Sequence, residues 1–483
     1  MQYSILFYIG SLLISIITAC WIYKWFYPKC DGILPPGSMG LPLLGETLQF
    51  LSSSTSFDIH PFVKKRMQRY GSVFKTNLVG SRIIVSADGD LNNYIFKQEG
   101  DLFRSWYPAS FTEVFGRQNI GTLHGFMYKY LKNMVMNLLG PEGLRKMLPD
   151  VENVSRNNLE RWARNGTIEA RESIAKMIFE LTAKKLISCD SEERREDLRE
   201  NFSAFIKGLI SFPANIPGTA YNKCMKGRKN VVAMLKDMLR ERRQNPRNEK
   251  VDFFDYVLEE LQQEGSILTE EIALDLMVTL LFASFETTSL ALTIAIKFLV
   301  DHPPVLKELI EEHKAIIRRR DTSDSYITWD EYKSMKFTFQ VINETVRLAN
   351  IAPGIFRKAT KDIKFNEYTI PSGWGVMVCL PAVHLNHDIY ENPLKFNPWR
   401  WEGIDTNVGS RNFMAFGGGM RLCVGAEFAK MQMAVFLHCL VTKYKWKSIE
   451  GGDIVRNPGL QYPHGYYIKI DRKSETMSYT RQR

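Results

Sequence analysis

Cysteine is sparse in this sequence, and its cysteines are unpaired. Seven cysteines are scattered along 483 residues, and no two of them form a Cys-x-x-Cys pair. An odd, dispersed set excludes the disulfide framework of small secreted domains and the usual spacing of a structural zinc site. We therefore expect the chain to fold in a reducing compartment.

Internal repeats and low-complexity blocks are also missing, and the positive charge is confined to one stretch. The net charge is +10, and residues 223–247 hold nine basic and two acidic residues. No aromatic residues alternate with these basic ones as they would in a nucleic-acid groove. The stretch indicates a solvated basic face, or one that meets anionic lipid or an acidic protein, and no nucleic-acid partner.

Charged side chains are absent from residues 3–23, which are rich in Ile, Leu and aromatics. About 20 apolar residues span a bilayer as a helix, and Lys24 and Lys29 follow directly, which places the remaining chain in the cytosol. The alternative, a cleaved signal peptide, would carry a charged leading region. We predict a membrane anchor over 1–27 and a stiff hinge, rich in proline and glycine, over 28–46.

Helical periodicity dominates the rest of the chain. Apolar residues spaced by three and four predict helices over 270–300, 304–320 and 337–349. Short strand-like segments occur at 74–87, 362–371, 374–380 and 465–470. We predict a mainly α fold with small β-sheets, formed by one domain over 47–470 and followed by a polar, disordered tail over 471–483.

Four glycines surround one cysteine and one arginine in FGGGMRLCVGAE, residues 416–427. A cysteine thiolate can ligate haem iron, and glycines let a backbone approach a flat macrocycle. Arg421, two residues before Cys423, suits a haem propionate through charge-assisted hydrogen bonds. A cysteine among glycines is otherwise a loop with a buried thiol, but the whole pattern F-G-G-G-x-R-x-C-x-G favours haem.

This stretch resembles the haem-binding signature of the cytochrome P-450 superfamily. The resemblance implies the P-450 fold, preceded by a single N-terminal transmembrane helix. It implies that Cys423 is the metal ligand and that Phe416 and Arg421 contact haem b.

Two further motifs are similar to elements of the same superfamily. Glu344-Thr345-Val346-Arg347 is similar to its ExxR element, in which the acid and the arginine share one helix face. Arg400, in FNPWRW at 396–401, stands at the second arginine motif. The resemblance implies a structural ion network of Glu344, Arg347 and Arg400 that locks the loop of Cys423.

The segment VTLLFASFETTSLAL, 278–292, places polar residues in the middle of an apolar helix. Ser and Thr hydroxyls often bond back to carbonyls one turn earlier. The segment also resembles the superfamily's oxygen-activation motif, which implies catalytic roles for Glu286 in proton relay and for Thr287 in organising hydrogen bonds. Ser284 stands where the family usually has glycine, so the geometry around oxygen is less well defined by the motif.

The resemblance also suggests haem contacts away from the cysteine. Tyr128 and Lys132 align with the Trp and Arg of the family's W-x-x-x-R propionate clamp, although both differ from it, and Arg357 resembles the arginine at the other propionate. Lys132 retains the charge without the bidentate fork of arginine. Exposed helical positions are the alternative for Tyr128 and Lys132.

Within the superfamily, the motifs look most like plant microsomal members of the clan that oxidises sterols and triterpenoids, above all the plant family numbered 87. The implied reaction is hydroxylation of a steroid or triterpenoid, with successive oxidations ending in carbon–carbon cleavage left open. Largely apolar segments supply the candidate pocket; ordinary core is the alternative. The candidate pocket residues are Trp106, Phe111, Phe282, Ala283, Ile351, Ala352 and Leu460.

The same resemblance implies the partners and the location. NADPH electrons would arrive through NADPH–cytochrome P-450 reductase, with cytochrome b5 as an additional candidate, and the chain would sit in the endoplasmic reticulum membrane with its catalytic domain in the cytosol. Two other functions stay open: a haem-thiolate isomerase or dehydratase that needs no reductase, and a non-catalytic haem-binding protein. The isomerase or dehydratase has no need of an acid–threonine pair, so Glu286 and Thr287 argue against it, and oxygen-dependent product formation would exclude the binding protein.

Overall fold

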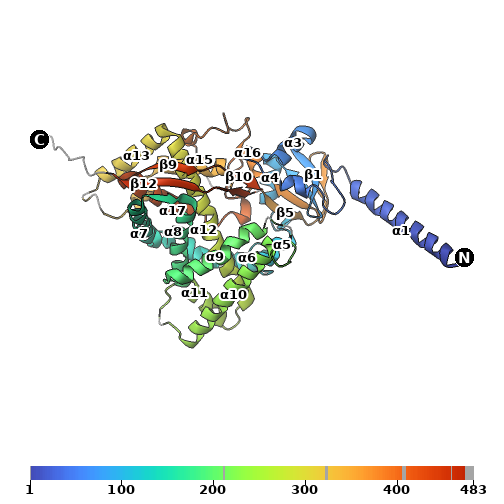
Figure 1. The fold of residues 1–483 in the computed structure, drawn as a ribbon, viewed down its shortest axis with the longest axis horizontal. Helices are drawn as coiled ribbons and strands as arrows, with labels where there is room; N and C mark the ends of the chain where they lie inside the picture. Colours follow the sequence, from blue (N-terminus) through green and yellow to red (C-terminus); the bar gives the residue numbers. More distant parts are fainter. Residues whose placement is uncertain are drawn as a thin grey trace.

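The N-terminal helix α1 (Gln2–Phe26) projects away from the rest of the chain, as Figure 1 shows. The computed structural model describes residues 2–473 except 210, 212, 248, 321, 323–324, 405–409 and 458, without the side chains of 2–6 and 206. The last strand, β12 (Tyr466–Arg472), runs two residues past the domain boundary predicted at 470. The remainder of the predicted tail, 474–483, lies outside the described residues.

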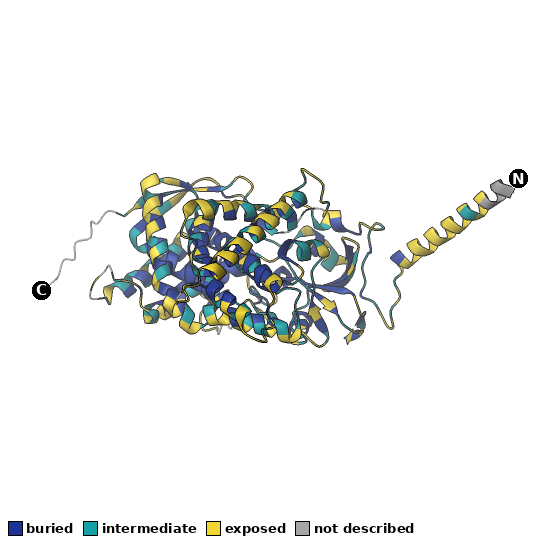
Figure 2. Ribbon diagram, turned by 90° about the horizontal axis from the view of Figure 1, so that it is seen from below, coloured by how far each residue is buried: buried dark blue, intermediate teal, exposed yellow. Residues whose placement is uncertain are grey.

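The exposure of α1 matches a membrane span. The span Phe7–Phe26 has a mean hydropathy of 1.5, and the 18-residue apolar window within it contains no buried residue; Figure 2 shows the helix almost entirely in the colour of exposed residues. Trp25, at its end, is instead buried, and its indole N–H donates to the Gly40 carbonyl at 3.2 Å. Helix α12 (Glu270–Asp301) is equally apolar but 67% buried, which identifies it as a core helix.

The other helices make up most of the domain. The predicted helices at 270–300, 304–320 and 337–349 correspond to α12, α13 and α15, and α13 ends two residues early, at Arg318. The helices are α2 (Thr47–Phe50), α3 (Pro61–Tyr70), α4 (Gly89–Lys97), α5 (Ala109–Phe115), α6 (Gly125–Leu139), α7 (Pro141–Asn165), α8 (Ala170–Ile187), α9 (Glu192–Leu209), α10 (Ala220–Gln244), α11 (Phe253–Gln262), α13 (Pro303–Arg318), α14 (Trp329–Ser334), α15 (Lys336–Ala349), α16 (Leu380–His384), α17 (Ala426–Lys443) and the 3₁₀ turns η1 (Pro398–Trp401) and η2 (Gly419–Arg421).

The strands form small sheets beside the helices. The largest sheet has the order β1-β2-β8-β5-β3, with β2 and β8 parallel and the other neighbours antiparallel. Its strands are β1 (Val73–Leu78), β2 (Ser81–Ser86), β3 (Phe103–Ser105), β5 (Ile355–Ala359) and β8 (Gly375–Val378). A second sheet has the order β4-β12-β9, and β6 with β7 and β10 with β11 form hairpins. These strands are β4 (Thr167–Glu169), β6 (Ile363–Phe365), β7 (Tyr368–Ile370), β9 (Tyr444–Gly451), β10 (Val455–Asn457) and β11 (Gly459–Gln461).

The four predicted strand segments overlap β1 and β2, β6 and β7, β8, and β12, with β1 beginning one residue earlier and β12 ending two residues later than predicted. Strands β3, β4, β5, β9, β10 and β11 were not predicted. Most of these are too short to show an alternating pattern over several residues. In β5, pairing with β3 places Arg357 directly opposite Ser105, and this register matters for the site below.

Helix α12 runs through the main hydrophobic core. It packs against α8, α15, α10, α13 and α17, and its buried residues belong to the main hydrophobic cluster; Figure 2 shows that buried residues gather in the interior of the domain. Its first turn is capped by Thr269, whose hydroxyl accepts the Ile272 N–H, as N-cap residues commonly do. The packing and the cap therefore hold the residues of α12 in fixed positions.

Candidate functional site

Backbone hydrogen bonds shape the loop that carries the cysteine and leads into α17. The Cys423 N–H donates to the Phe416 carbonyl at 3.0 Å, and the Ala426 N–H donates to the Cys423 carbonyl at 3.3 Å. Gly419 has φ 64°, and a Cβ there would lie 2.1 Å from the carbonyl oxygen of Phe96 in α4. Glycine is thus required at position 419 because the loop backbone passes close to α4. We had predicted that the glycines let the backbone approach a macrocycle.

Cys423 is exposed, although enough protein atoms surround its thiol to desolvate it. Burial raises its pKa, and a hydrogen bond from the Gly425 N–H to the sulfur acts in the opposite direction. A backbone N–H directed at sulfur stabilises a thiolate, and a coordinating thiol is deprotonated by the metal itself. The sulfur is therefore accessible and supported as a ligand.

Two arginines and one glutamate lie beside this loop, and we call Glu99, Arg357 and Arg421 the Glu99 cluster. Glu99 Oε1 accepts the Arg421 Nε–H at 2.7 Å and the Ser105 N–H at 3.1 Å. Glu99 Oε2 lies 2.6 Å from Arg357 Nε as an ion pair without an aligned hydrogen bond. The β3–β5 register brings Arg357 next to Ser105 and Glu99, and Arg421 reaches the same carboxylate from the cysteine loop.

Arg421 has further partners on the segment before α6. Its terminal nitrogens donate to the carbonyls of Ile120 and Leu123 and to His124 Nδ1, the last at 3.0 Å. Burial, and then the nearby Arg421 charge, lower the pKa of His124, which favours its neutral, accepting form. Sequence reasoning missed both Glu99 and His124; the only local signal was the place of His124 one helical turn before Tyr128.

Tyr128 and Lys132 converge on one backbone atom. The Tyr128 hydroxyl donates to the Met420 carbonyl at 3.1 Å, and the Lys132 ammonium donates to the same carbonyl at 2.7 Å. The Arg421 guanidinium lies 4.1 Å from the centre of the Tyr128 ring, within the range of a cation–π contact. Both predicted residues therefore border the cysteine loop at Met420, three residues before Cys423.

The polar residues of α12 divide between two faces. Between Ile272 and Val300, Ala283 and Thr287 are the exposed residues, and they lie one turn apart on the same face. The Thr287 hydroxyl bonds back to the Ala283 carbonyl at 3.3 Å, and Ser284 bonds back to Leu281 at 3.0 Å. The uncovered face thus presents small side chains and one hydroxyl.

Glu286 is paired with a residue that sequence reasoning missed. Its carboxylate forms an ion pair with Arg171, in the first turn of α8. Arg171 is held in place because the side chain of Glu169 caps α8 and accepts the Arg171 N–H at 3.3 Å. No pattern around position 171 indicates this contact, because the two residues are 115 positions apart.

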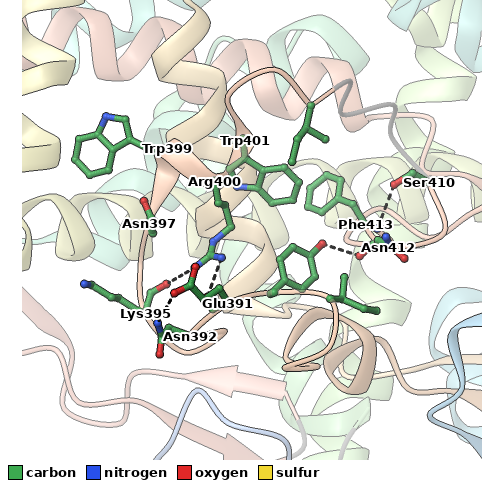
Figure 3. Close-up of a pocket in the computed structure, with 13 residues that line it drawn as sticks. Glu391, Asn392, Lys395, Asn397, Trp399, Arg400, Trp401, Ser410, Asn412 and Phe413 are labelled. Atoms are coloured by element: carbon green, nitrogen blue, oxygen red, sulfur yellow. Dashed lines mark hydrogen bonds between the residues drawn. The ribbon is translucent and has the colours of Figure 1, made fainter.

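Glu344, Arg347 and Arg400, which we call the Glu344 network, meet at the buried carboxylate of Glu344. Glu344 accepts two N–H bonds from Arg347 at 2.8 Å each and one from Arg400 Nε at 2.9 Å. It also accepts the Asn397 backbone N–H and the Trp401 indole N–H, both at 3.0 Å. Figure 3 shows Arg400 directing its terminal nitrogens to the backbone carbonyls of Glu391 and Lys395.

The structure brings only some of the predicted pocket residues together. Phe111 lies 4.6 Å from Phe115, measured between ring centres, and Phe115 lies 5.3 Å from Phe282. Phe282 also stacks on Phe205 at 5.6 Å. This aromatic cluster joins α5, α9 and α12 on the side of α12 near Ala283.

The other predicted pocket residues lie elsewhere. Trp106 follows β3 and packs on Phe356 of β5, with ring centres 6.2 Å apart. Ile351 and the exposed Ala352 follow α15. Leu460 is buried opposite Arg456 in the β10–β11 hairpin, and Arg456 donates to carbonyls at the end of α15. Through Phe356 and Tyr107, Trp106 is nevertheless joined to Phe111 of the aromatic cluster: Tyr107 lies 6.0 Å from Phe356 and stacks on Phe111 at 4.3 Å between ring centres.

The donor set fits an iron porphyrin that carries two carboxylates. It offers a thiol for the iron, buried guanidinium groups for the carboxylates, and an uncovered helix face with a hydroxyl and a neighbouring acid. A mainly α fold with this set of groups defines a haem-thiolate monooxygenase.

The chain belongs to the cytochrome P-450 family. The family model described as "Cytochrome P450" matches residues 35–469. The chain is accordingly a monooxygenase that uses haem b and receives NADPH electrons through a reductase.

Similar proteins agree with this assignment. "Cytochrome P450 87A3" of Oryza sativa subsp. japonica is 57% identical over 94% of this chain and 89% of that protein. A "Beta-amyrin 16-alpha-hydroxylase" of Maesa lanceolata is 44% identical over 97% of this chain and 99% of that protein. The solved structure of a retinoic acid-bound cyanobacterial CYP120A1 has a TM-score of 0.82 and 26% identity, covering 92% of this chain and 100% of that one. Other relatives are named as hydroxylases of triterpenoids and sterols.

Proposed function

We propose that this protein hydroxylates a steroid or triterpenoid skeleton or side chain at a haem iron bound by Cys423. The observation that supports this most directly is the accessible Cys423 sulfur, reached by the Gly425 N–H, in a chain 44% identical to a β-amyrin hydroxylase. When bound through a thiolate, haem b supplies the activation of dioxygen.

The basic and aromatic residues around the cysteine loop have the role of holding the cofactor. Arg357 and Arg421 provide buried charge for the two propionates, and Lys132 and Tyr128 border the same edge. Phe416 contributes its carbonyl to the loop and its ring to a cation–π contact with Lys430 at 5.6 Å. Guanidinium groups suit carboxylates because they offer a planar fork of donors.

Glu286 and Thr287 have the role of moving protons. The Thr287 hydroxyl faces the uncovered side of α12 and can accept or donate a hydrogen bond there. Glu286 must leave its ion pair with Arg171 to take up a proton that it passes on. Because a proton donor must lie within hydrogen-bond reach of the group it serves, Thr287 acts nearest to the reaction and Glu286 supplies it.

The substrate reaches the site from the bilayer and contacts apolar side chains there. The aromatic cluster of α5, α9 and α12 offers stacking surfaces without charged groups, which suits a polycyclic hydrocarbon skeleton. The anchor α1 places the domain at a bilayer in which such substrates dissolve, and Lys24 and Lys29 orient the domain to the cytosolic side. The membrane proposed is that of the endoplasmic reticulum, with cytochrome b5 as a candidate second electron donor.

Microsomes that contain the full chain and a plant reductase test this proposal. With NADPH, oxygen and a panel of triterpenes and sterols, we expect a hydroxylated product by mass spectrometry and NMR. Conversion without NADPH would instead indicate an isomerase or dehydratase, and a haem-loaded protein without any product would indicate a binding protein. A time course separates a single hydroxylation from successive oxidations that end in carbon–carbon cleavage.

A further inference from the structure

Glu99 is a buried carboxylate for which the assigned chemistry provides no role. Its side chain is 3% exposed, and it stands between Arg357, which is 2% exposed, and Arg421, which is 9% exposed. It reaches both arginines through their Nε atoms, one at each carboxylate oxygen, at 2.6 and 2.7 Å. One side chain thereby sets the distance between two guanidinium groups that come from β5 and from the cysteine loop.

The charges in this cluster do not balance. Two guanidinium groups share one carboxylate, which leaves an excess of one positive charge, and the lowered pKa of His124 keeps that neighbour neutral. Burying an uncompensated charge is costly. Among the described residues, Arg357 donates through Nη1 to the Phe356 carbonyl at 2.8 Å and makes no hydrogen bond through Nη2. The cluster is therefore prepared to accept a further anionic oxygen.

We propose that Glu99 is a positioning residue for the cofactor: by holding the Nε atoms of Arg357 and Arg421, it fixes both guanidinium groups at the haem edge and leaves Arg357 Nη2 free for a haem carboxylate. This inference rests on the proposed function, in which those two arginines bind the propionates. Glu99 does not touch the reacting atoms and acts only through the arginines. A carboxylate is required because its two oxygens serve two donors, whereas an amide offers one acceptor oxygen.

Three single variants of the full chain separate positioning from charge and from stability. Glu99→Asp keeps the charge but is one methylene too short to reach both arginines. Glu99→Gln keeps the length but removes the charge and one acceptor. Glu152→Gln is the matched control, because Glu152 is also buried and paired with an arginine, Arg156, and accepts the Ile327 N–H at 2.7 Å, remote from the cysteine loop.

The primary measurement is the rate at which haem is lost to an excess of apomyoglobin. We expect both Glu99 variants to lose haem on the order of tenfold faster, as expected when a hydrogen bond to a charged group is removed. Glu152→Gln should lower the unfolding temperature but keep the wild-type rate of haem loss. Unchanged or slower loss in the Glu99 variants would overturn the proposal, since slower loss means that Glu99 competes with the propionates.

The iron midpoint potential is a second measurement that a merely structural residue would not change. Glu99→Gln should shift it to more positive values, because a negative charge has left the haem edge, while Glu99→Asp and Glu152→Gln should stay near wild type. An unshifted potential in Glu99→Gln would also contradict the proposal. Failure of the proposed function gives a different result: the wild-type ferrous carbonyl adduct would then lack the Soret band of thiolate ligation.

Discussion

The Glu344 network and the Glu99 cluster have the same composition: each places one buried glutamate between two arginines. They differ in how completely the glutamate is hydrogen-bonded. Glu344 accepts five N–H groups, whereas Glu99 accepts two aligned bonds and one ion pair. The same set of charges is therefore fully hydrogen-bonded within the protein in the Glu344 network, whereas the Glu99 cluster keeps a donor free for a ligand.

The difference shows that a count of buried charges does not reveal their role. Five hydrogen bonds fix the carboxylate of the Glu344 network, so a change at Glu344 must break several bonds at once. Unsatisfied donors in the Glu99 cluster leave it able to respond to an added anion. The two regions should consequently respond differently to substitution.

The largest effect is expected from Glu344→Gln. The substitution leaves Arg347, fully buried, and Arg400 without their carboxylate, at a cost of about 3–5 kcal/mol in the free energy of unfolding. We expect little folded, haem-loaded protein, measured as haem per chain after purification. Glu391→Gln, which changes an exposed side chain in the same region, should leave the yield unchanged. A normal yield for Glu344→Gln would remove the distinction between the two regions.

Arg357→Gln should affect cofactor binding more than folding. It removes one guanidinium from the open cluster, at a cost of roughly 1.5–3 kcal/mol in haem affinity. We expect faster haem transfer to apomyoglobin while circular dichroism stays that of the wild type. Arg104→Gln, an exposed change in the neighbouring strand β3, is the control and should retain haem normally. Equal haem loss in both variants would contradict the role given to Arg357.

The histidine beside the Glu344 network should give a pH-dependent stability. Burial, and then Arg347, lower the pKa of His384 to about 3, and its ring bonds to Asn350 and to the Met414 N–H at 2.7 and 2.9 Å. As the pH falls, the histidine of the unfolded chain takes up a proton at the ordinary pKa, before His384 of the folded chain does. The contribution of His384 to the free energy of unfolding is therefore fully present above the ordinary histidine pKa and declines as the pH falls toward about 3.

His384→Gln should reduce this slope by about 1.4 kcal/mol per pH unit within that range. Urea unfolding at a series of pH values measures the slope, with the exposed His387→Gln as control. An unchanged slope would show that His384 is not held neutral by the fold.

Lys132→Gln should have the smallest effect. The ammonium is partly exposed and bonds to the Met420 carbonyl, so solvent screens its charge and the loss is about 0–1 kcal/mol. We expect haem transfer to quicken by less than about fivefold. Haem loss as fast as that of Arg357→Gln would show that Lys132 acts as part of the Glu99 cluster rather than at its border.

Much of the fold follows from local patterns. Apolar spacing predicted α12, α13 and α15, and the uncharged N-terminal run predicted the exposed helix α1. The glycine-rich loop with Cys423 and the ExxR pair were recognisable because each is compressed into a few consecutive residues. The short strand β5, which carries Arg357, was missed because five half-buried residues show no clear period.

The sequence by itself determined the anchor, the helical class and the cysteine loop, because helix periodicity and motif spacing act over neighbouring residues. Only the tertiary structure decided which charges meet. Arg421 and Glu99 are 322 positions apart, Glu286 and Arg171 are 115 apart, and His124 reaches Arg421 across 297 positions. Such pairs depend on strand register and helix packing, which bring distant segments together and leave no local signal in the chain.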